Sequence, residues 1–177
     1  MRKTLILMFH PDPAQSRANA ALAAAARGRR EVELVDMQAR HPDGCVDVAA
    51  EAALLRGAGR LVLQFPLQWY ATPAPMKAWM DAVLTHLFYL HPEEGRMLEG
   101  VKLLVAATAG NVQAAYAPDG ANLFPMEALL APLRATAHRC GMPWTAPFVV
   151  YGANRLDASG LEAAGAAYVA RLRELAA

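Results

Sequence analysis

The sequence has few cysteines and no excess of charge of either sign. Its two cysteines, Cys45 and Cys140, fit neither a CxxC motif nor a zinc-ligand spacing. A disulfide framework is therefore not expected, and a reducing cytoplasm is the predicted location. Lysine plus arginine number 17 and aspartate plus glutamate number 16, so the net charge is only +1. This balance argues against a protein that binds nucleic acid or an anionic membrane through its overall charge.

Long hydrophobic runs are also absent. The first apolar run, residues 5–9, follows a basic start but ends before Pro11, which is too short for a signal peptide. No run approaches the roughly 18 residues that a membrane span needs. The chain has 177 residues, of which 55% are hydrophobic, and these values are typical of one soluble globular domain covering residues 1–177.

Short apolar runs alternate along the chain with longer, alanine-rich stretches. The runs that predict strands cover residues 4–9, 31–36, 60–65, 101–107 and 144–151. The stretches that predict helices cover residues 16–26, 47–56, 73–87 and 125–140, and a last segment that opens with a capping-box spacing, Ser159 to Glu162. Five strands alternating with five helices favour an α/β fold, with a parallel sheet covered on both faces.

Ligands of such a sheet bind beyond the carboxyl ends of its strands. This rule selects residues 10–19, 66–72 and 108–116 as the segments of a candidate site. The first segment offers imidazole, hydroxyl and amide donors at a helix start, where free N–H groups and the helix dipole favour a phosphate. It contains neither a P-loop nor a GxGxxG motif. The alternative is that Ser16 only caps the helix.

The second and third segments have the character of a ring-binding site. Trp69 and Tyr70 would wall a planar ring, or would instead anchor their loop to the core or to a partner chain. Around Gly110, backbone N–H groups would meet polar atoms of a ring, although a plain turn explains this sequence equally well. The residues alone leave both alternatives open.

The histidines outside these segments do not indicate a metal site. His86 and His91 are five residues apart, which is the wrong step for one face of an α-helix. Cys45 has no candidate partner nearby. We therefore expect no bound metal.

Several motifs together resemble one known family. They are His10-Pro, Ser16-x-x-Asn19, Pro66-Leu-Gln-Trp69-Tyr70-x-x-Pro73, Met76-Lys-x-Trp79-x-Asp81 and Thr108-x-Gly110. The pattern resembles the NAD(P)H:quinone oxidoreductases of flavodoxin-like fold. Within them it is most similar to the small bacterial branch that includes the ancillary subunit of glutathione-regulated potassium efflux systems. The likeness spans most of the chain, and its specific part is the aromatic loop joined to the helix that follows.

The resemblance implies a flavodoxin-like, doubly wound sheet of five parallel strands in the order 2-1-3-4-5. It implies a homodimer with FMN rather than FAD, because the relatives that hold FAD have longer chains. NADH or NADPH would pass a hydride through flavin N5 to a quinone, in a ping-pong reaction of two electrons. By position, the residues that would hold the FMN phosphate are His10, Ser16, Arg17, Ala18 and Asn19. Those that would border the isoalloxazine are Leu67, Gln68, Trp69, Tyr70, Thr108, Ala109, Gly110 and Asn111.

The resemblance also assigns a catalytic residue and leaves two other functions open. Tyr116 matches a family tyrosine that is paired with a downstream histidine, and in this chain Asn122 falls near the place of that histidine. Lys77, Trp79 and Asp81 are expected to pack and pair at a dimer seam. One alternative function is the reduction of azo or nitro compounds on the same flavin. The other is a regulatory subunit that binds flavin and nucleotide and contacts a membrane potassium transporter.

Overall fold

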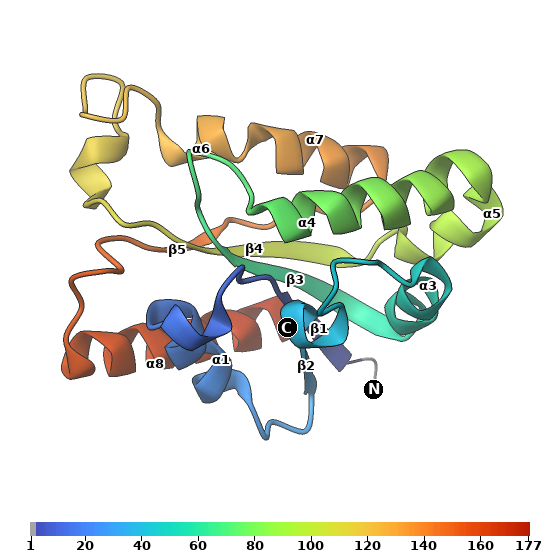
Figure 1. Cartoon of the computed structure of the whole chain (residues 1–177), viewed down its shortest axis with the longest axis horizontal. Coiled ribbons are helices and arrows are strands. Elements are labelled where there is room, and N and C mark those ends of the chain that lie inside the picture. Colours follow the sequence, from blue (N-terminus) through green and yellow to red (C-terminus); the bar gives the residue numbers. More distant parts are fainter. Residues whose placement is uncertain (1–2) are drawn as a thin grey trace.

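The computed structural model describes residues 3–177 and contains a five-stranded sheet (Figure 1). Its strands are β1 (Lys3–Met8), β2 (Val32–Asp36), β3 (Ala58–Pro66), β4 (Lys102–Thr108) and β5 (Phe148–Val150). Neighbouring strands pair in parallel in the order β2-β1-β3-β4-β5, which confirms the predicted doubly wound fold. The order of connection reverses between β1 and β3, so the switch point of the fold lies there.

Helices cover both faces of this sheet. The α-helices are α1 (Ala18–Ala26), α2 (Met37–Arg40), α3 (Val48–Arg56), α4 (Ala74–Trp79), α5 (Pro92–Gly95), α6 (Met126–Leu129), α7 (Ala131–Arg139) and α8 (Ala158–Ala176). Short 3-10 turns are η1 (Pro13–Gln15), η4 (Arg96–Leu98) and η5 (Gln113–Tyr116), and π-helical turns are η2 (Met80–Leu84) and η3 (His86–Leu90). In Figure 1, α1 and α8 lie below the sheet, and α4 and α7 lie above it.

Two apolar clusters, one on each face, hold these layers together. Side chains alternate along a strand, so Leu5 and Leu7 of β1 face the cluster that includes α4 and α7. Ile6 faces the other cluster, with Leu22 of α1 and Tyr168 of α8. Burial on both faces explains why the strands read as continuous apolar runs rather than as alternating ones.

On the second face, α1 and α8 approach closely at Gly165. A Cβ atom on this glycine would lie 3.0 Å from the Cβ of Ala25 and 3.6 Å from the carbonyl oxygen of Ala21. Side chains larger than hydrogen would therefore push the two helices apart. The small residues of α1 and α8 serve this contact as much as they serve helix propensity.

The helix predicted over residues 73–87 is α-helical only at its start and continues through η2 and η3 to Leu90. In a π-helical turn an N–H donates to the carbonyl five residues earlier. The N–H of His91 donates in this way to the carbonyl of His86, at 2.8 Å. The two imidazole rings consequently lie in contact, with centroids 4.3 Å apart. The expectation that these histidines could not share a face was wrong, because it assumed α-helical spacing.

Other element predictions are corrected at their ends. The predicted helix over residues 125–140 is two helices, α6 and α7, separated at Leu130, with Pro132 in the first turn of α7. The cap of α8 is Asp157, whose carboxylate accepts the N–H of Gly160 at 2.8 Å. Ser159 lies inside the first turn and donates to Asp157, so the predicted capping box was wrong. The four-residue helices α2 and α5 were not predicted.

Candidate functional site

The three predicted segments meet beyond the carboxyl ends of β1, β3 and β4. The side-chain amide of Asn19 donates to the Thr108 hydroxyl at 2.8 Å, which joins the first segment to the third. The N–H of Leu67 donates to the carbonyl of Thr108 at 2.8 Å, which joins the second to the third. Sheet topology has thus gathered residues that lie almost 90 positions apart in the chain.

A cavity of about 150 Å³ lies at the N-terminus of α1. Its lining is rich in hydrogen-bond donors and comprises His10, Gln15, Ser16, Arg17, Ala18, Asn19, Pro66, Thr108, Ala153 and Asn154. The first N–H groups of a helix have no carbonyl in a preceding turn, and the helix dipole adds positive potential there. The residue set predicted for a phosphate therefore surrounds one cavity whose chemistry suits an anion.

His10 presents a neutral imidazole to this cavity. Partial burial lowers the pKa of His10 below its ordinary value, because burial disfavours the charged ring. The backbone N–H of Asp12 donates to Nδ1 at 3.2 Å. Nε2 then carries the proton of the neutral ring and remains available as a donor to a ligand.

In this structure Ser16 and Arg17 both form hydrogen bonds to other parts of the protein. The Ser16 hydroxyl oxygen accepts the N–H of Ala20 at 3.0 Å, so the helix-capping function exists. Its hydroxyl proton remains free to be donated, because accepting one bond does not use it. The Arg17 guanidinium donates to the carbonyls of Leu156, at 2.7 Å, and Asn154, at 3.4 Å. Arg17 thereby fixes the loop that precedes α8 against the start of α1.

Gln64 is a member of the site that the sequence analysis missed. It is fully buried in β3, and its amide donates to the carbonyl of Asn19 at 2.9 Å. Its Oε1 is buried and has no partner among residues 3–177. A glutamine inside the apolar run of residues 61–65 was the available signal. Gln64 braces Asn19, which in turn braces Thr108.

The aromatic segment forms a tight turn with an unusual backbone. Gln68 and Ala71 exchange two backbone hydrogen bonds of 3.0 Å, and the two residues between them have positive φ, 45° at Trp69 and 64° at Tyr70. This is a type I′ arrangement, in which bulky side chains are strained. Trp69 is 93% exposed, so its side chain does not anchor the loop to the core of this chain. The turn instead presents an indole to the outside.

The third segment closes the site from the β4 side. The N–H of Ala109 donates to the carbonyl of Val150 at 2.8 Å. A Cβ atom on Gly110 would lie 3.0 Å from the amide nitrogen of Asn154. The absence of a side chain therefore lets the backbone at Gly110 approach Asn154, in the loop after β5, closely. That loop also ends at the ligand-binding edge, and the strand-end rule would have selected it too.

Tyr116 lies close to other aromatic hydroxyl groups. Its ring centroid is 5.5 Å from that of Tyr151, and burial raises the pKa of the Tyr116 phenol above its ordinary value. The Tyr70 hydroxyl donates to the Asn122 side-chain oxygen at 3.4 Å. Asn122 therefore contacts the aromatic turn, near the place where relatives are expected to carry a histidine.

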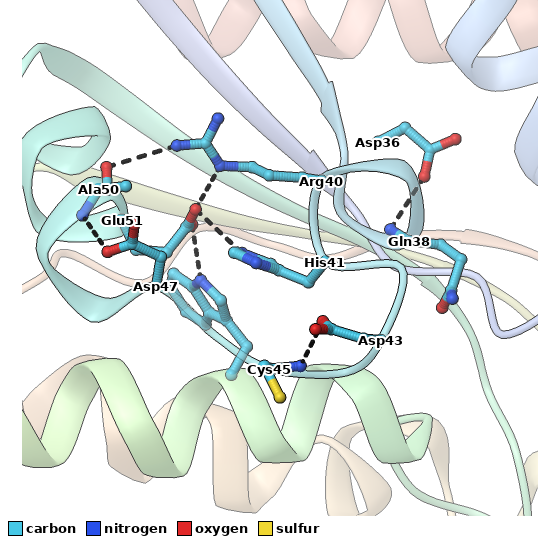
Figure 2. A network of polar contacts seen from close by, with 10 residues as sticks. Asp36, Gln38, Arg40, His41, Asp43, Cys45, Asp47, Ala50 and Glu51 are labelled. Atoms are coloured by element: carbon cyan, nitrogen blue, oxygen red, sulfur yellow. Dashed lines mark hydrogen bonds and ion pairs between the residues drawn. The ribbon is translucent and has the colours of Figure 1, made fainter.

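A buried carboxylate fixes the helix that follows the aromatic turn (Figure 2). Glu51 of α3 has no exposed surface and accepts hydrogen bonds from Trp79 Nε1 at 2.8 Å and His41 Nε2 at 3.1 Å. Arg40 Nε donates to the same oxygen as His41. Trp79 was expected at a dimer seam, but only 2% of it is exposed and it packs inside the chain.

Lys77 and Asp81, by contrast, lie on the outer surface of this helical segment. They form an exposed ion pair with a nitrogen–oxygen distance of 2.5 Å.

Among residues 3–177, no helix combines the length and the hydropathy required to span a bilayer.

A doubly wound parallel sheet, with an anion-accepting cavity at its switch point and aromatic loops at the same edge, defines an α/β protein of the flavodoxin type. The chain belongs to the family described as having the flavodoxin-like fold, which matches residues 2–175. This family includes both potassium-efflux ancillary proteins and quinone reductases. The resemblance stated from the sequence is thereby confirmed.

Similarity to individual proteins extends over nearly the whole chain. The glutathione-regulated potassium-efflux system ancillary protein KefG of Pectobacterium carotovorum is 39% identical over 166 residues, which are 94% of this chain and 90% of that protein. The structure of general stress protein 14 from Treponema denticola, solved in complex with FMN, is 32% identical with a TM-score of 0.89. This match covers 98% of the present chain and 99% of the chain of general stress protein 14. A structure described as an NADPH-quinone reductase from P. pentosaceus is 28% identical, with a TM-score of 0.82 over 94% and 95% of the two chains.

Proposed function

We propose that the protein is an FMN-dependent NAD(P)H:quinone oxidoreductase. The observation that supports this most is the donor-lined cavity at the N-terminus of α1, next to the outward aromatic turn. The first feature suits a phosphate and the second suits a planar ring, as the two ends of FMN require. A protein of the same fold, 32% identical to this one, was solved in complex with FMN.

The residues present fit this cofactor. Neutral His10, the Ser16 hydroxyl and the first N–H groups of α1 are donors, and a phosphate accepts. Gly110 lies close against Asn154, whose side-chain amide lines the same cavity and adds a further donor. When bound, FMN supplies hydride transfer at its N5 atom, which amino-acid side chains cannot perform.

In this proposal the protein binds the cofactor, orients it, and holds one proton on Tyr116. His10, Ser16 and residues 17–19 hold the phosphate, while residues 67–70 and 108–111 border the ring. Tyr116 keeps its phenolic proton at neutral pH, as an ordinary tyrosine does, and burial raises its pKa further. It is then a hydrogen-bond donor toward charge that develops on a bound ring or a quinone oxygen.

Steady-state kinetics and cofactor release test the proposal. The freshly purified protein should show a flavin absorption spectrum, and acid precipitation should release FMN rather than FAD. With NADH or NADPH and a soluble quinone both varied, double-reciprocal plots should be parallel, because the two substrates would use one site in turn. A colourless protein that takes up neither flavin contradicts the proposal, and intersecting lines contradict the shared site.

We also propose that the active form is a homodimer. An apolar cavity of about 320 Å³ between the aromatic turn and α7 is lined by residues such as Leu67, Tyr70 and Met80. Leu123 and Phe124 are exposed beyond it, by 68% and 57%. A second chain seated on this face would cover apolar surface that a monomer leaves in water, and would close the site beside Trp69.

A second function is favoured by similarity to KefG, whose name describes an ancillary protein of a potassium-efflux system. In this alternative the protein binds flavin and nucleotide and regulates a membrane transporter. Potassium efflux from vesicles that contain such a transporter should then depend on added protein, whether or not a quinone is present. Reduction of azo or nitro compounds remains an extension of the same chemistry, and competition between such compounds and a quinone tests it.

A further inference from the structure

Two imidazoles and a carboxylate converge at the turn between η3 and α5. One ligand atom from each of His86, His91 and Glu94 lies within 4.8 Å of the others. The π-helical turn creates this arrangement, because its five-residue hydrogen bond places His91 over His86. We propose that these three residues bind a divalent transition-metal ion, with Zn²⁺ as the best match.

The donor set is the reason for this choice of ion. Two histidine nitrogens and one carboxylate oxygen are the protein ligands of zinc sites that keep a fourth position for water. Hard cations such as Mg²⁺ and Ca²⁺ prefer sets made of oxygen alone. All three ligands lie within residues 86–94, in η3, α5 and the turn between them, so they occupy one short and locally ordered segment.

Neighbouring charges support two of the three ligands. The Glu93 carboxylate lies 3.6 Å from His91 Nδ1, and a carboxylate beside one imidazole nitrogen orients a histidine that binds metal through its other nitrogen. Arg56 Nη2 lies 3.0 Å from Glu94 Oε2, which leaves Oε1 for the metal. The same ion pair competes with a cation for Glu94, so Arg56 should lower the metal affinity.

This site is remote from the candidate flavin site. In Figure 1, α5 lies at the right-hand end of the molecule, whereas the loops that follow β4 and β5 lie at the left. The metal would therefore clamp the chain reversal between η3 and α5 and would not touch the reacting groups. Metal binding and flavin content should then vary independently of each other.

Cobalt and zinc titrations of the full chain, without a histidine tag and after chelator treatment, test the site. One Co²⁺ per chain should bind and give visible d–d absorption, and one equivalent of Zn²⁺ should abolish it. His91→Ala and Glu94→Gln should each lower the affinity by more than roughly tenfold. Arg56→Gln should raise it several-fold. His138→Ala is the matched control, because His138 is an exposed histidine on α7, outside the cluster, and its replacement should change nothing.

Both flavin content and circular dichroism of the variants should match the original chain, which separates loss of metal from loss of fold. The proposal is overturned if the original chain binds no Co²⁺, or if His91→Ala binds as tightly as His138→Ala. Equal affinity for Glu94→Gln and the original chain also overturns the three-ligand site.

Discussion

Ser16 illustrates how one side chain can satisfy two explanations at once, and a single substitution separates them. Aspartate caps a helix as well as serine does, and its charge suits the helix dipole by roughly 0.3–1 kcal/mol. If capping Ala20 is the whole function of Ser16, Ser16→Asp should keep both stability and flavin content.

If Ser16 faces the FMN phosphate, the same substitution should give a stable protein that lacks flavin. Two like charges 4 Å apart repel by about 4 kcal/mol at an effective dielectric constant of 20. Even half that value lowers affinity roughly 30-fold. FMN released per chain, measured with Ser16→Ala as the mild control, decides the question. Full FMN occupancy in Ser16→Asp would place the phosphate elsewhere.

Replacement of Trp69 should stabilise the fold and weaken function. Its side chain is almost fully exposed while its φ is 45°, so the fold gains little packing from a strained residue. Trp69→Asn should raise the free energy of unfolding by roughly 1 kcal/mol, since asparagine tolerates this conformation. Flavin affinity or quinone turnover should fall. Tyr89→Asn, an exposed aromatic residue without positive φ, should show no such gain in urea unfolding.

At the residue scale, sequence reasoning located segments better than it located functions. It selected Ser16, Trp69 and Gly110 because each follows a predicted strand. It missed Gln64, because a polar residue inside a strand shows its importance only when its partner on α1, Asn19, is known. No local pattern announces positive φ at Trp69, since tryptophan rarely adopts it.

At the level of elements, Glu51 should be the most sensitive acidic residue of this chain to substitution. It connects α3 to Trp79 of α4 and to the end of α2 through His41 and Arg40. Glu51→Gln should lower the free energy of unfolding by about 3 kcal/mol, at the lower end for broken buried pairs because a third of the Arg40 side chain is exposed. Glu162→Gln, on the exposed surface of α8, should change it by less than about 0.5 kcal/mol. Equal urea midpoints for the two variants would contradict this assignment.

The contact between α1 and α8 makes a second prediction. Gly165→Leu should destabilise the protein by about 1–3 kcal/mol, because a larger side chain meets Ala25 and forces the helices apart. Ala166→Leu places the same side chain one position further along the helix, on its exposed surface, and should be nearly neutral. Thermal unfolding of both variants measures the difference. Similar melting temperatures would show that α1 and α8 can separate at little cost.

Elements with clear start and stop signals were predictable, and those without were not. Residues 47–56 begin at an Asp47 cap and end before Gly57, and α3 follows as predicted. The π-helical turns have no such signal, because the sequence of residues 80–90 is also compatible with an α-helix. Helices α2 and α5 are a single turn each, which is too short for periodicity to show.

For the molecule as a whole, the proposed homodimer can be dissociated by one charge. Met80 is half-buried and lines the apolar cavity on the proposed interface. Met80→Glu would bury a carboxylate between two chains, and a penalty of about 3 kcal/mol weakens association roughly 100-fold. Sedimentation at micromolar concentration should then show monomers with reduced flavin. Ala167→Glu, on the exposed side of α8, should leave a dimer. An original chain that sediments as an active monomer contradicts the dimer itself.

The order of the strands came from resemblance rather than from the residues themselves. Periodicity indicated five strands and a parallel sheet, but many orders satisfy that description. The structure confirms the order and so places residues 10–19, 66–72 and 108–116 at one edge. The loop after β5 reaches the same edge, because β5 pairs in parallel with β4, and the strand-end rule applied to the fifth predicted strand would have selected it.

Both outer strands of the sheet carry features that oppose further strand addition. On one side, β5 has three residues, Pro147 precedes it, and Arg171 donates to the carbonyl of Ala146 at 2.8 Å. On the other side, β2 carries exposed Glu33. Short edges, proline and charge are the devices by which natural sheets avoid aggregation. Copies of this chain should therefore associate through helices and loops, and the protein should resist forming amyloid-like ribbons even at high concentration.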